Sequence, residues 1–259
     1  MSNSEPSLPT ATRTDERLTM GHWWEQAKEI DVPQPETHFL NIDPPEEGQK
    51  PQYDISEAMH IVAKLGGEAF IKGGFRSAET ARANHITEPS KQAINTTIQE
   101  FIDEMIMRQT PIGRGIYFRE YLPLTWDKFT RADYHPEVRF FIRDGEVICH
   151  HLRTDLPDDP LHEREDITRF FDPDHASFPK ITQAVHEYAE QVAATFNDGW
   201  WSVDFVLSTN YNWYLTDMAI DALQYIEKQD EWSNISNHQG DCKHDLENIY
   251  QMKQHQSST

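Results

Sequence analysis

Apolar residues recur at three- and four-residue intervals in three segments of the chain, which is the spacing of an amphipathic helix. In residues 54–67, Asp54 or Ser56 is available as a cap and two glycines end the pattern. Residues 89–109 and 178–196 carry similar apolar stripes. We therefore predict three helices. Their inward-facing residues include Ile55, Met59, Val62, Leu65, Ile94, Ile98, Phe101, Ile102, Met105, Ile106, Ile181, Val185, Tyr188, Val192 and Phe196.

Shorter runs rich in β-branched and aromatic residues predict strands. EAFIK is followed by a glycine loop, and GIYFREYL reads as a strand of a central sheet. EVRFFIRDGEVICHHLR predicts a hairpin whose turn, Asp144-Gly145, suits positive φ. WWSVDFVLS and NWYLTDMAI, separated by TNYN, predict a second antiparallel hairpin.

The two ends of the chain lack this patterning. Residues 1–20 are polar, and 31–53 is rich in proline and acids, so we expect 1–54 to be a weakly ordered or irregular arm. Residues 228–259 are expected to form a polar tail with a short helix at DLENIYQMK, and a helical turn is expected at Ser77. The ordered domain is expected over 55–227.

The amino-acid composition limits the classes of partner that the protein is expected to bind. The 259 residues carry a formal charge of −21, which disfavours non-specific nucleic-acid binding and anionic membranes. The same acidity is typical of proteins from salty cytoplasm, and we favour that halophilic interpretation. Two cysteines are too few for a disulfide framework. With neither an apolar span nor a secretory signal, we expect a cytoplasmic location.

Two aspartates interrupt the last pair of strands. Asp204 and Asp217 each lie within an apolar run, and a buried carboxylate needs a compensating partner. If the hairpin places both on one face, a shared Mg²⁺ that also holds phosphate is one such partner. The alternative is that each pairs with an arginine or caps a strand end.

Two basic residues are further candidates. Lys72 ends a strand before a glycine loop, a setting that suits phosphate binding, although a solvated lysine at a strand end is the simpler interpretation. Arg139 lies on a strand where it can grip phosphate, or can instead pair with Glu137 on the same face.

In this order, five segments resemble the ATP-grasp superfamily: FIKGGFRSA, YFREYLPL, PEVRFFIRDGEVICHHLR, SVDFVL and WYLTDMA. The pattern is most similar to the cell division cycle protein 123 family and related small ATP-grasp proteins of phages and microbes. The resemblance implies an α+β fold in which two lobes with mostly antiparallel sheets, 55–122 and 123–227, clasp ATP.

The resemblance also implies the site residues. Lys72 would lie at the phosphates, and the strand Arg119, Glu120, Tyr121 and Leu122 would form the adenine hinge. Arg139 would contact phosphate or ribose, with Glu137 beside it and Arg153 as a further contact. Asp204 and Asp217 would ligate magnesium.

One position departs from the pattern. ATP-grasp proteins usually carry an asparagine two residues after the second acidic ligand, and here that residue is Ala219. Three alternatives follow: Asp221 substitutes from the next turn, a single metal ion is bound, or catalytic competence is reduced. We expect an ATP-dependent carboxylate–amine ligase acting through an acyl phosphate, with Lys72 and Arg139 as catalytic groups. The alternative is an ATP-binding assembly factor that grips a protein partner.

Overall fold

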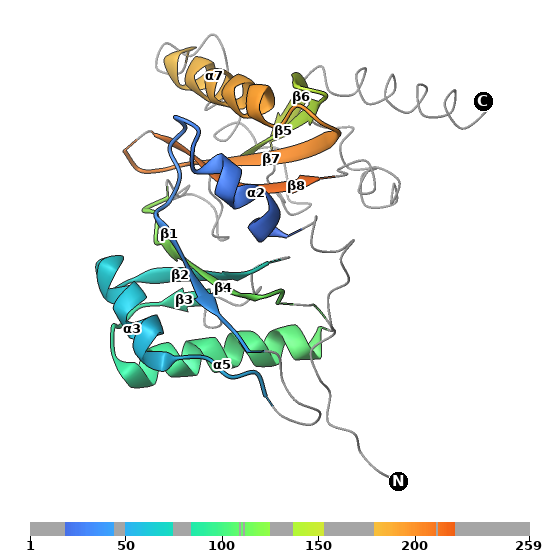
Figure 1. The fold of residues 1–259 in the computed structure, drawn as a ribbon. Coiled ribbons are helices and arrows are strands. Elements are labelled where there is room, and N and C mark those ends of the chain that lie inside the picture. The colour runs from blue at the N-terminus through green and yellow to red at the C-terminus, as the bar shows by residue number, and fades with distance from the viewer. Residues whose placement is uncertain are drawn as a thin grey trace, which may run out of the picture. The chain divides into compact units, whose positions relative to one another are not determined.

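A computed structural model describes residues 19–43, 50–74, 84–108, 110, 112–124, 137–152, 179–210 and 212–220. The chain divides into two compact units (Figure 1). Unit 1 comprises Met1–Glu25 and Pro35–Leu122, and unit 2 comprises Gln26–Gln34 and Pro123–Thr259. Each unit is built around its own antiparallel sheet.

Unit 1 contains a four-stranded sheet in the order β1-β4-β2-β3. Two helices cover one face of this sheet (Figure 1), and their apolar stripes pack against Ile71, Ile116 and Phe118, all fully buried. The first six residues of α2 also belong to this unit. The elements are α2 (Met20–Ala27), β1 (Thr37–Asn41), α3 (Ile55–Lys64), β2 (Ala69–Gly73), β3 (His85–Ile86), α5 (Lys91–Met107) and β4 (Gly115–Glu120).

Unit 2 contains the second four-stranded sheet, in the order β6-β5-β7-β8, with one helix packed on it (Figure 1). Phe140 from β5 lies at the centre of the core, with ring contacts to His186 of α7 and Phe205 of β7. The elements are β5 (Glu137–Arg143), β6 (Glu146–Leu152), α7 (Pro179–Thr195), β7 (Trp200–Leu207) and β8 (Trp213–Ile220).

The predicted elements are confirmed where local chemistry specifies them. Asp54 caps α3 by accepting the N–H groups of Ser56 and Glu57 at 2.7 and 3.4 Å. The first hairpin turns at Asp144 and Gly145, with φ of 49° and 87°. The α+β class is likewise confirmed.

The irregular arm expected before residue 55 is wrong for two segments. Residues 20–27 form α2, and Thr37–Asn41 forms β1, which pairs with β4 from Thr37↔Arg119 to Asn41↔Gly115. The strand is only five residues long, so its apolar pattern was too short to outweigh the surrounding prolines. The turn at Ser77 and the tail at 228–259 lie outside the described residues.

Candidate functional site

The sheet of unit 2 aligns three charged side chains on adjacent strands. Arg139 of β5 is the register partner of Asp204 in β7, and Asp204 is the partner of Asp217 in β8. Directly opposed residues of an antiparallel ladder project to the same face. Arg139, Asp204 and Asp217 therefore form one row across three strands, which we call the charged rung.

Within the charged rung, Arg139 and Asp204 form a bidentate ion pair. Nε and an Nη atom of Arg139 donate to the two oxygens of Asp204, each at 2.7 Å. The Asp204 side chain is 3% exposed and that of Arg139 is 17% exposed. A carboxylate this deeply buried requires such compensation, so the arginine pairing foreseen as the alternative for Asp204 is present.

A β-bulge positions Asp217. The ladder shifts register between Asp204 and Phe205, so Asp204 faces Asp217 while Phe205 faces Leu215. Thr216 is the extra residue, and its hydroxyl donates to the backbone oxygen of Asp204 at 3.2 Å. Leu215 can therefore enter the core, fully buried, while Asp217 two residues later lies on the opposite face.

Asp217 is less enclosed than Asp204. Its Oδ1 accepts the backbone N–H of Met218 at 2.9 Å, and the residue is partly exposed. A carboxylate has about four lone-pair sites, and this bond uses one of them.

The next row on the same face joins Phe141, Ser202 and Ala219, which are also register partners. We call it the neutral rung. Sequence reasoning singled out Ala219 but missed Ser202. The signal that could have found it is its position two residues before Asp204 in a strand, which places both on one face.

The opposite face of the sheet belongs to the core. Phe140 and Phe205 lie there, and His186 of α7 contacts the Phe140 ring edge-on at 5.1 Å. Burial lowers the pKa of His186, and the carboxylate of Glu190 partly opposes this effect. Strand alternation thus gives the sheet one apolar face and one charged face.

Lys72 in unit 1 is also buried. It is the register partner of Tyr117, on the face of the sheet opposite the fully buried Ile71 and Phe118. Lys72 is only 4% exposed, so the interpretation as a solvated strand-end lysine is wrong. Arg119, 5% exposed, lies two residues after Tyr117 and shares this face, which therefore carries two buried cations.

Tyr117 lies between these cations. Burial, together with the nearby carboxylate of Glu25, raises the pKa of its hydroxyl to about 12, and Arg114 partly opposes this effect. The ring packs against Trp24 of α2 at 5.7 Å and against Phe39 of β1 at 5.0 Å. These rings pack around Tyr117, the register partner of Lys72.

The expected hinge residues follow at the end of β4. The N–H of Glu120 donates to the Glu36 carbonyl at 2.7 Å, so this N–H is already hydrogen-bonded within the protein. The Tyr121 ring stacks on His85, with ring centres 3.8 Å apart. Leu122 is buried at 8% exposure.

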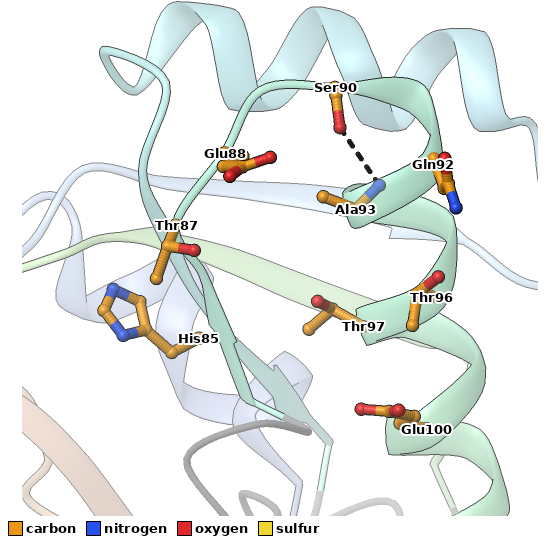
Figure 2. Close-up of a pocket in the computed structure, with 9 residues that line it drawn as sticks. All are labelled: His85, Thr87, Glu88, Ser90, Gln92, Ala93, Thr96, Thr97 and Glu100. Atoms are coloured by element: carbon orange, nitrogen blue, oxygen red, sulfur yellow. Dashed lines mark hydrogen bonds between the residues drawn. The ribbon is translucent and has the colours of Figure 1, made fainter.

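A separate cavity lies in unit 1 between β3 and the first turns of α5 (Figure 2). It has a volume of about 560 Å³, and Figure 2 shows Thr87 and Thr97 pointing toward each other across it. None of the site residues predicted from the sequence lines it. The lining residues are His85, Thr87, Glu88, Ser90, Gln92, Ala93, Thr96, Thr97 and Glu100.

The charged rung fits magnesium through its donor chemistry. Among the residues that the structure describes, no three His, Cys, Asp or Glu side chains gather into a metal-binding group. Mg²⁺ at nucleotide sites, however, is commonly held by one or two carboxylates together with phosphate oxygens. Asp204 and Asp217 supply such a pair. Asp221 and Arg153 lie outside the described residues.

No helix in the described part of the chain has the length and apolar character to cross a membrane.

No family model and no curated protein matches the sequence.

Solved structures do resemble this fold. C-terminally truncated Cdc123 from Schizosaccharomyces pombe matches with a TM-score of 0.51 and 12% identity over 89% of this chain and 94% of that one. A RimK-domain ATP-grasp protein from Sphaerobacter thermophilus gives a TM-score of 0.45 and 12% identity over 80% of this chain and 59% of that one. D-alanine–D-alanine ligase from Bacillus anthracis, complexed with ATP, gives a TM-score of 0.45 and 10% identity over 79% of this chain and 53% of that one.

This chain spans little more than half the length of the last two proteins. At 12% identity the similarity to Cdc123 establishes the fold alone, and the chain shares the fold of that protein, as the resemblance of its five motifs predicted.

Proposed function

We propose that this protein binds ATP together with Mg²⁺ and uses the nucleotide to join a carboxylate to an amine or similar nucleophile. The observation that carries the proposal is the charged rung, in which one arginine and two aspartates occupy one face of an ATP-grasp sheet. Asp204 and Asp217 would hold the cation, and Arg139 would contact phosphate.

The charge of the rung favours metal and nucleotide binding together. One guanidinium and two carboxylates leave a net negative charge, which repels a triphosphate. Mg²⁺ would reverse that sign and supply Lewis-acid stabilisation at the transferred phosphoryl group. Mg²⁺ and ATP should therefore bind more tightly together than separately.

Arg139 has two roles in this scheme. Without ligand, its two hydrogen bonds at 2.7 Å satisfy the buried carboxylate of Asp204. Asp204 and Asp217 would hold the cation when it is bound, and the guanidinium of Arg139 would then be available to phosphate oxygens in the same bidentate manner. Glu137, two residues earlier on the strand, shares the face of Arg139 and would help to orient it.

Lys72 and Arg119 are the proposed nucleotide-binding cations of unit 1. Both are at least 95% buried on one face of the sheet, where an ammonium and a guanidinium attract phosphate strongly because little water screens them. Backbone groups of Tyr121 and Leu122 are better candidates for reading the adenine than Glu120, whose N–H is already bonded to Glu36. Arg153 remains a proposed substrate contact and Asp221 a proposed metal ligand.

The proposed reaction has two steps. A substrate carboxylate oxygen attacks the γ-phosphorus of ATP, the bond to the β-phosphate oxygen breaks, and ADP leaves. The amine then attacks the acyl carbon of the resulting acyl phosphate, loses a proton and displaces inorganic phosphate. Cationic groups at the phosphoryl group lower the barrier because they match the charge that develops there. No protein nucleophile is required.

A second function is favoured by one specific residue. Ala219 lies on the charged face one row from Asp217 and contributes no metal-binding atom. A site with fewer protein ligands suits a nucleotide-binding assembly factor with slow turnover or none. ADP release on adding pooled amino acids, peptides or amines would identify the ligase, and its absence at both high and low salt would favour the assembly factor.

Calorimetry with Asp217→Asn tests the metal site. We expect Mg-ATP affinity to fall at least tenfold, about 1.4 kcal/mol, because the neutral amide attracts the cation less. Asp144→Asn is the matched control, because it replaces the same carboxylate by the same amide on an exposed turn of the same sheet. Equal affinity in wild type and Asp217→Asn would refute the assignment of Asp217.

A substitution of Lys72 tests whether unit 1 contributes to nucleotide binding. Lys72→Met keeps the length of the side chain but removes its charge, and we expect ATP affinity to fall even without divalent cation. Lys64→Met, at the end of α3, is the control because that lysine lies on a helix instead of the cationic face. Unchanged binding in Lys72→Met would remove Lys72 from the site.

A further inference from the structure

The cavity between β3 and the first turns of α5 is not used by the function proposed above. Its volume of about 560 Å³ falls within the range of about 300–1,000 Å³ that is typical of small-molecule sites. Apart from Ala93, every described residue that lines it carries a polar or charged side chain. Such a lining suits a hydrophilic ligand.

The charge of the lining is negative. Glu88 and Glu100 supply two carboxylates, and no lysine or arginine is present among the described lining residues. A ligand that carries phosphate would be repelled there. A bound metal ion is disfavoured as well, because no three His, Cys, Asp or Glu side chains of the described residues gather into a metal-binding group. The lining therefore favours an organic cation.

The two carboxylates lie apart along the cavity. Figure 2 shows Glu88 beside the first turn of α5 and Glu100 farther along this helix, with Thr87 and Thr97 between them. Ser90 caps the helix, and the backbone rises about 15 Å from this cap to Glu100. Two separated carboxylates with hydroxyl groups between them match a long ligand with an ammonium group at each end.

Thr97 supplies an independent sign of a polar ligand. It is 8% exposed and lies on the buried side of α5 between the fully buried Ile94 and Ile98. A valine of the same shape would avoid the cost of burying a hydroxyl at such a position. Figure 2 shows the Thr97 side chain pointing across the cavity toward Thr87. A ligand in the cavity would give this buried polar side chain a hydrogen-bond partner.

The walls of the cavity are held in place by contacts within unit 1. The ring of His85 stacks on Tyr121 with ring centres 3.8 Å apart, and its Nε2 lies 2.7 Å from Oε1 of Glu68. On the opposite wall, the Ser90 hydroxyl accepts the N–H of Ala93 at 3.2 Å. A wall that is already ordered loses less conformational entropy when a ligand binds.

We propose that this cavity binds a linear polyamine. Its ammonium groups pair with Glu88 and Glu100, and the hydroxyls of Thr87 and Thr97 accept hydrogen bonds from its N–H groups. Its methylene groups pack on Ala93 and on the threonine methyl groups. The proposal does not depend on nucleotide binding, because neither Lys72 nor any residue of the charged rung lines the cavity.

Calorimetric titration of the full-length protein with spermidine tests the proposal. At about 0.15 M salt, screening weakens the attraction of spermidine to scattered surface carboxylates, so wild type should show a single dominant site. Glu88→Gln and Glu100→Gln should each bind spermidine about tenfold more weakly, because each loses a charge-assisted hydrogen bond. Glu57→Gln is the matched control, since it removes the same charge from an exposed position on α3 in unit 1, and its affinity should stay within about twofold of wild type.

Thr97→Val separates recognition by the hydroxyl from attraction by charge. We expect this variant to bind spermidine about fivefold more weakly, because the hydrogen bond is lost while the shape of the side chain is kept. Its thermal unfolding temperature should not fall, since valine buries no polar group. Xylitol, a neutral polyol, is the control ligand and should bind more weakly than spermidine.

Three results would overturn the proposal. Equal weakening in Glu57→Gln and in the cavity variants would mean that spermidine binds the acidic surface as a whole. Tighter binding of xylitol than of spermidine would identify a site for neutral polyols. Unchanged affinity in Glu88→Gln would also overturn it, and this exposed position decides the question if Glu100→Gln unfolds. Loss of Mg-ATP binding with spermidine binding retained would overturn only the function proposed above.

Discussion

Replacement of Arg139 by methionine should destabilise unit 2 far more than the loss of one partly exposed side chain would suggest. Methionine keeps most of the aliphatic volume but removes both hydrogen bonds to Asp204, each 2.7 Å long. The Asp204 side chain is 3% exposed and cannot recover these bonds from water. The variant therefore leaves the buried carboxylate without the two hydrogen bonds that Arg139 donates.

The expected loss is about 3 kcal/mol. Removing one partner of a buried ion pair typically costs about 3–5 kcal/mol. The lower end applies here because the Arg139 side chain is 17% exposed, so solvent already weakens the pair. Such a loss is a large fraction of the about 5–15 kcal/mol that stabilises a folded domain.

Hydrogen exchange followed by mass spectrometry measures this effect locally. Amides of β5, β7 and β8 should exchange about 100-fold faster in Arg139→Met, since each 1.4 kcal/mol corresponds to about a factor of ten. Amides of β2 and β4 in unit 1 serve as the internal control. The double variant Arg139→Met, Asp204→Leu should recover most of the protection, because a neutral apolar pair has no charge to compensate.

Two results would refute this reasoning. Exchange in β7 that changes less than about fivefold would mean that the Arg139–Asp204 pair contributes little. A double variant less protected than Arg139→Met would mean that packing, and not the buried charge, determines the loss. A cation should also protect the single variant: if Asp204 is a metal ligand, Mn²⁺ should slow exchange of β7 in Arg139→Met.

Two further predictions concern pH. The pKa of Tyr117 is raised from its ordinary value of 10.0 to about 12. The unfolded chain therefore loses this proton first, and stability should fall as the pH rises between these values, by up to about 3 kcal/mol. Absorbance titration at 295 nm and urea unfolding should show the dependence in wild type but not in Tyr117→Phe. The pKa of His186 is lowered from 6.5, so the unfolded chain binds this proton first and stability should fall as the pH drops below 6.5. Urea unfolding at pH 5 and 7.5 should show a smaller difference in the free energy of unfolding for His186→Phe than for wild type. An equal difference in the two proteins would contradict the burial of His186.

The sequence predicted the site where short-range geometry determines it. A tight hairpin restricts how its two strands can align, so Asp204 and Asp217 could be expected on neighbouring strands. The alignment that the structure shows depends on the bulge at Thr216, and no residue in WYLTDMAI predicts a bulge there. Without that bulge, Leu215 and Asp217 would share a face, and one of them would be misplaced.

Pairings between distant segments could not be predicted. Arg139 and Asp204 are 65 residues apart and meet because β5 lies between β6 and β7, a strand order that apolar spacing does not encode. Glu137 was therefore the only partner for Arg139 within reach of sequence reasoning.

The Arg139–Asp204 pair explains how one face of a sheet can carry two neighbouring aspartates and remain stable. Two buried or half-buried carboxylates on neighbouring strands repel each other, and the bidentate arginine offsets that repulsion. In the proposed site, a divalent cation would offer the same compensation at the same oxygens, so arginine and metal would compete for Asp204. Phosphate would shift the competition toward metal because it would give the displaced guanidinium a new anionic partner. Under this proposal nucleotide and cation are coupled through one side chain, and replacing Arg139 should weaken that coupling even where each ligand still binds alone.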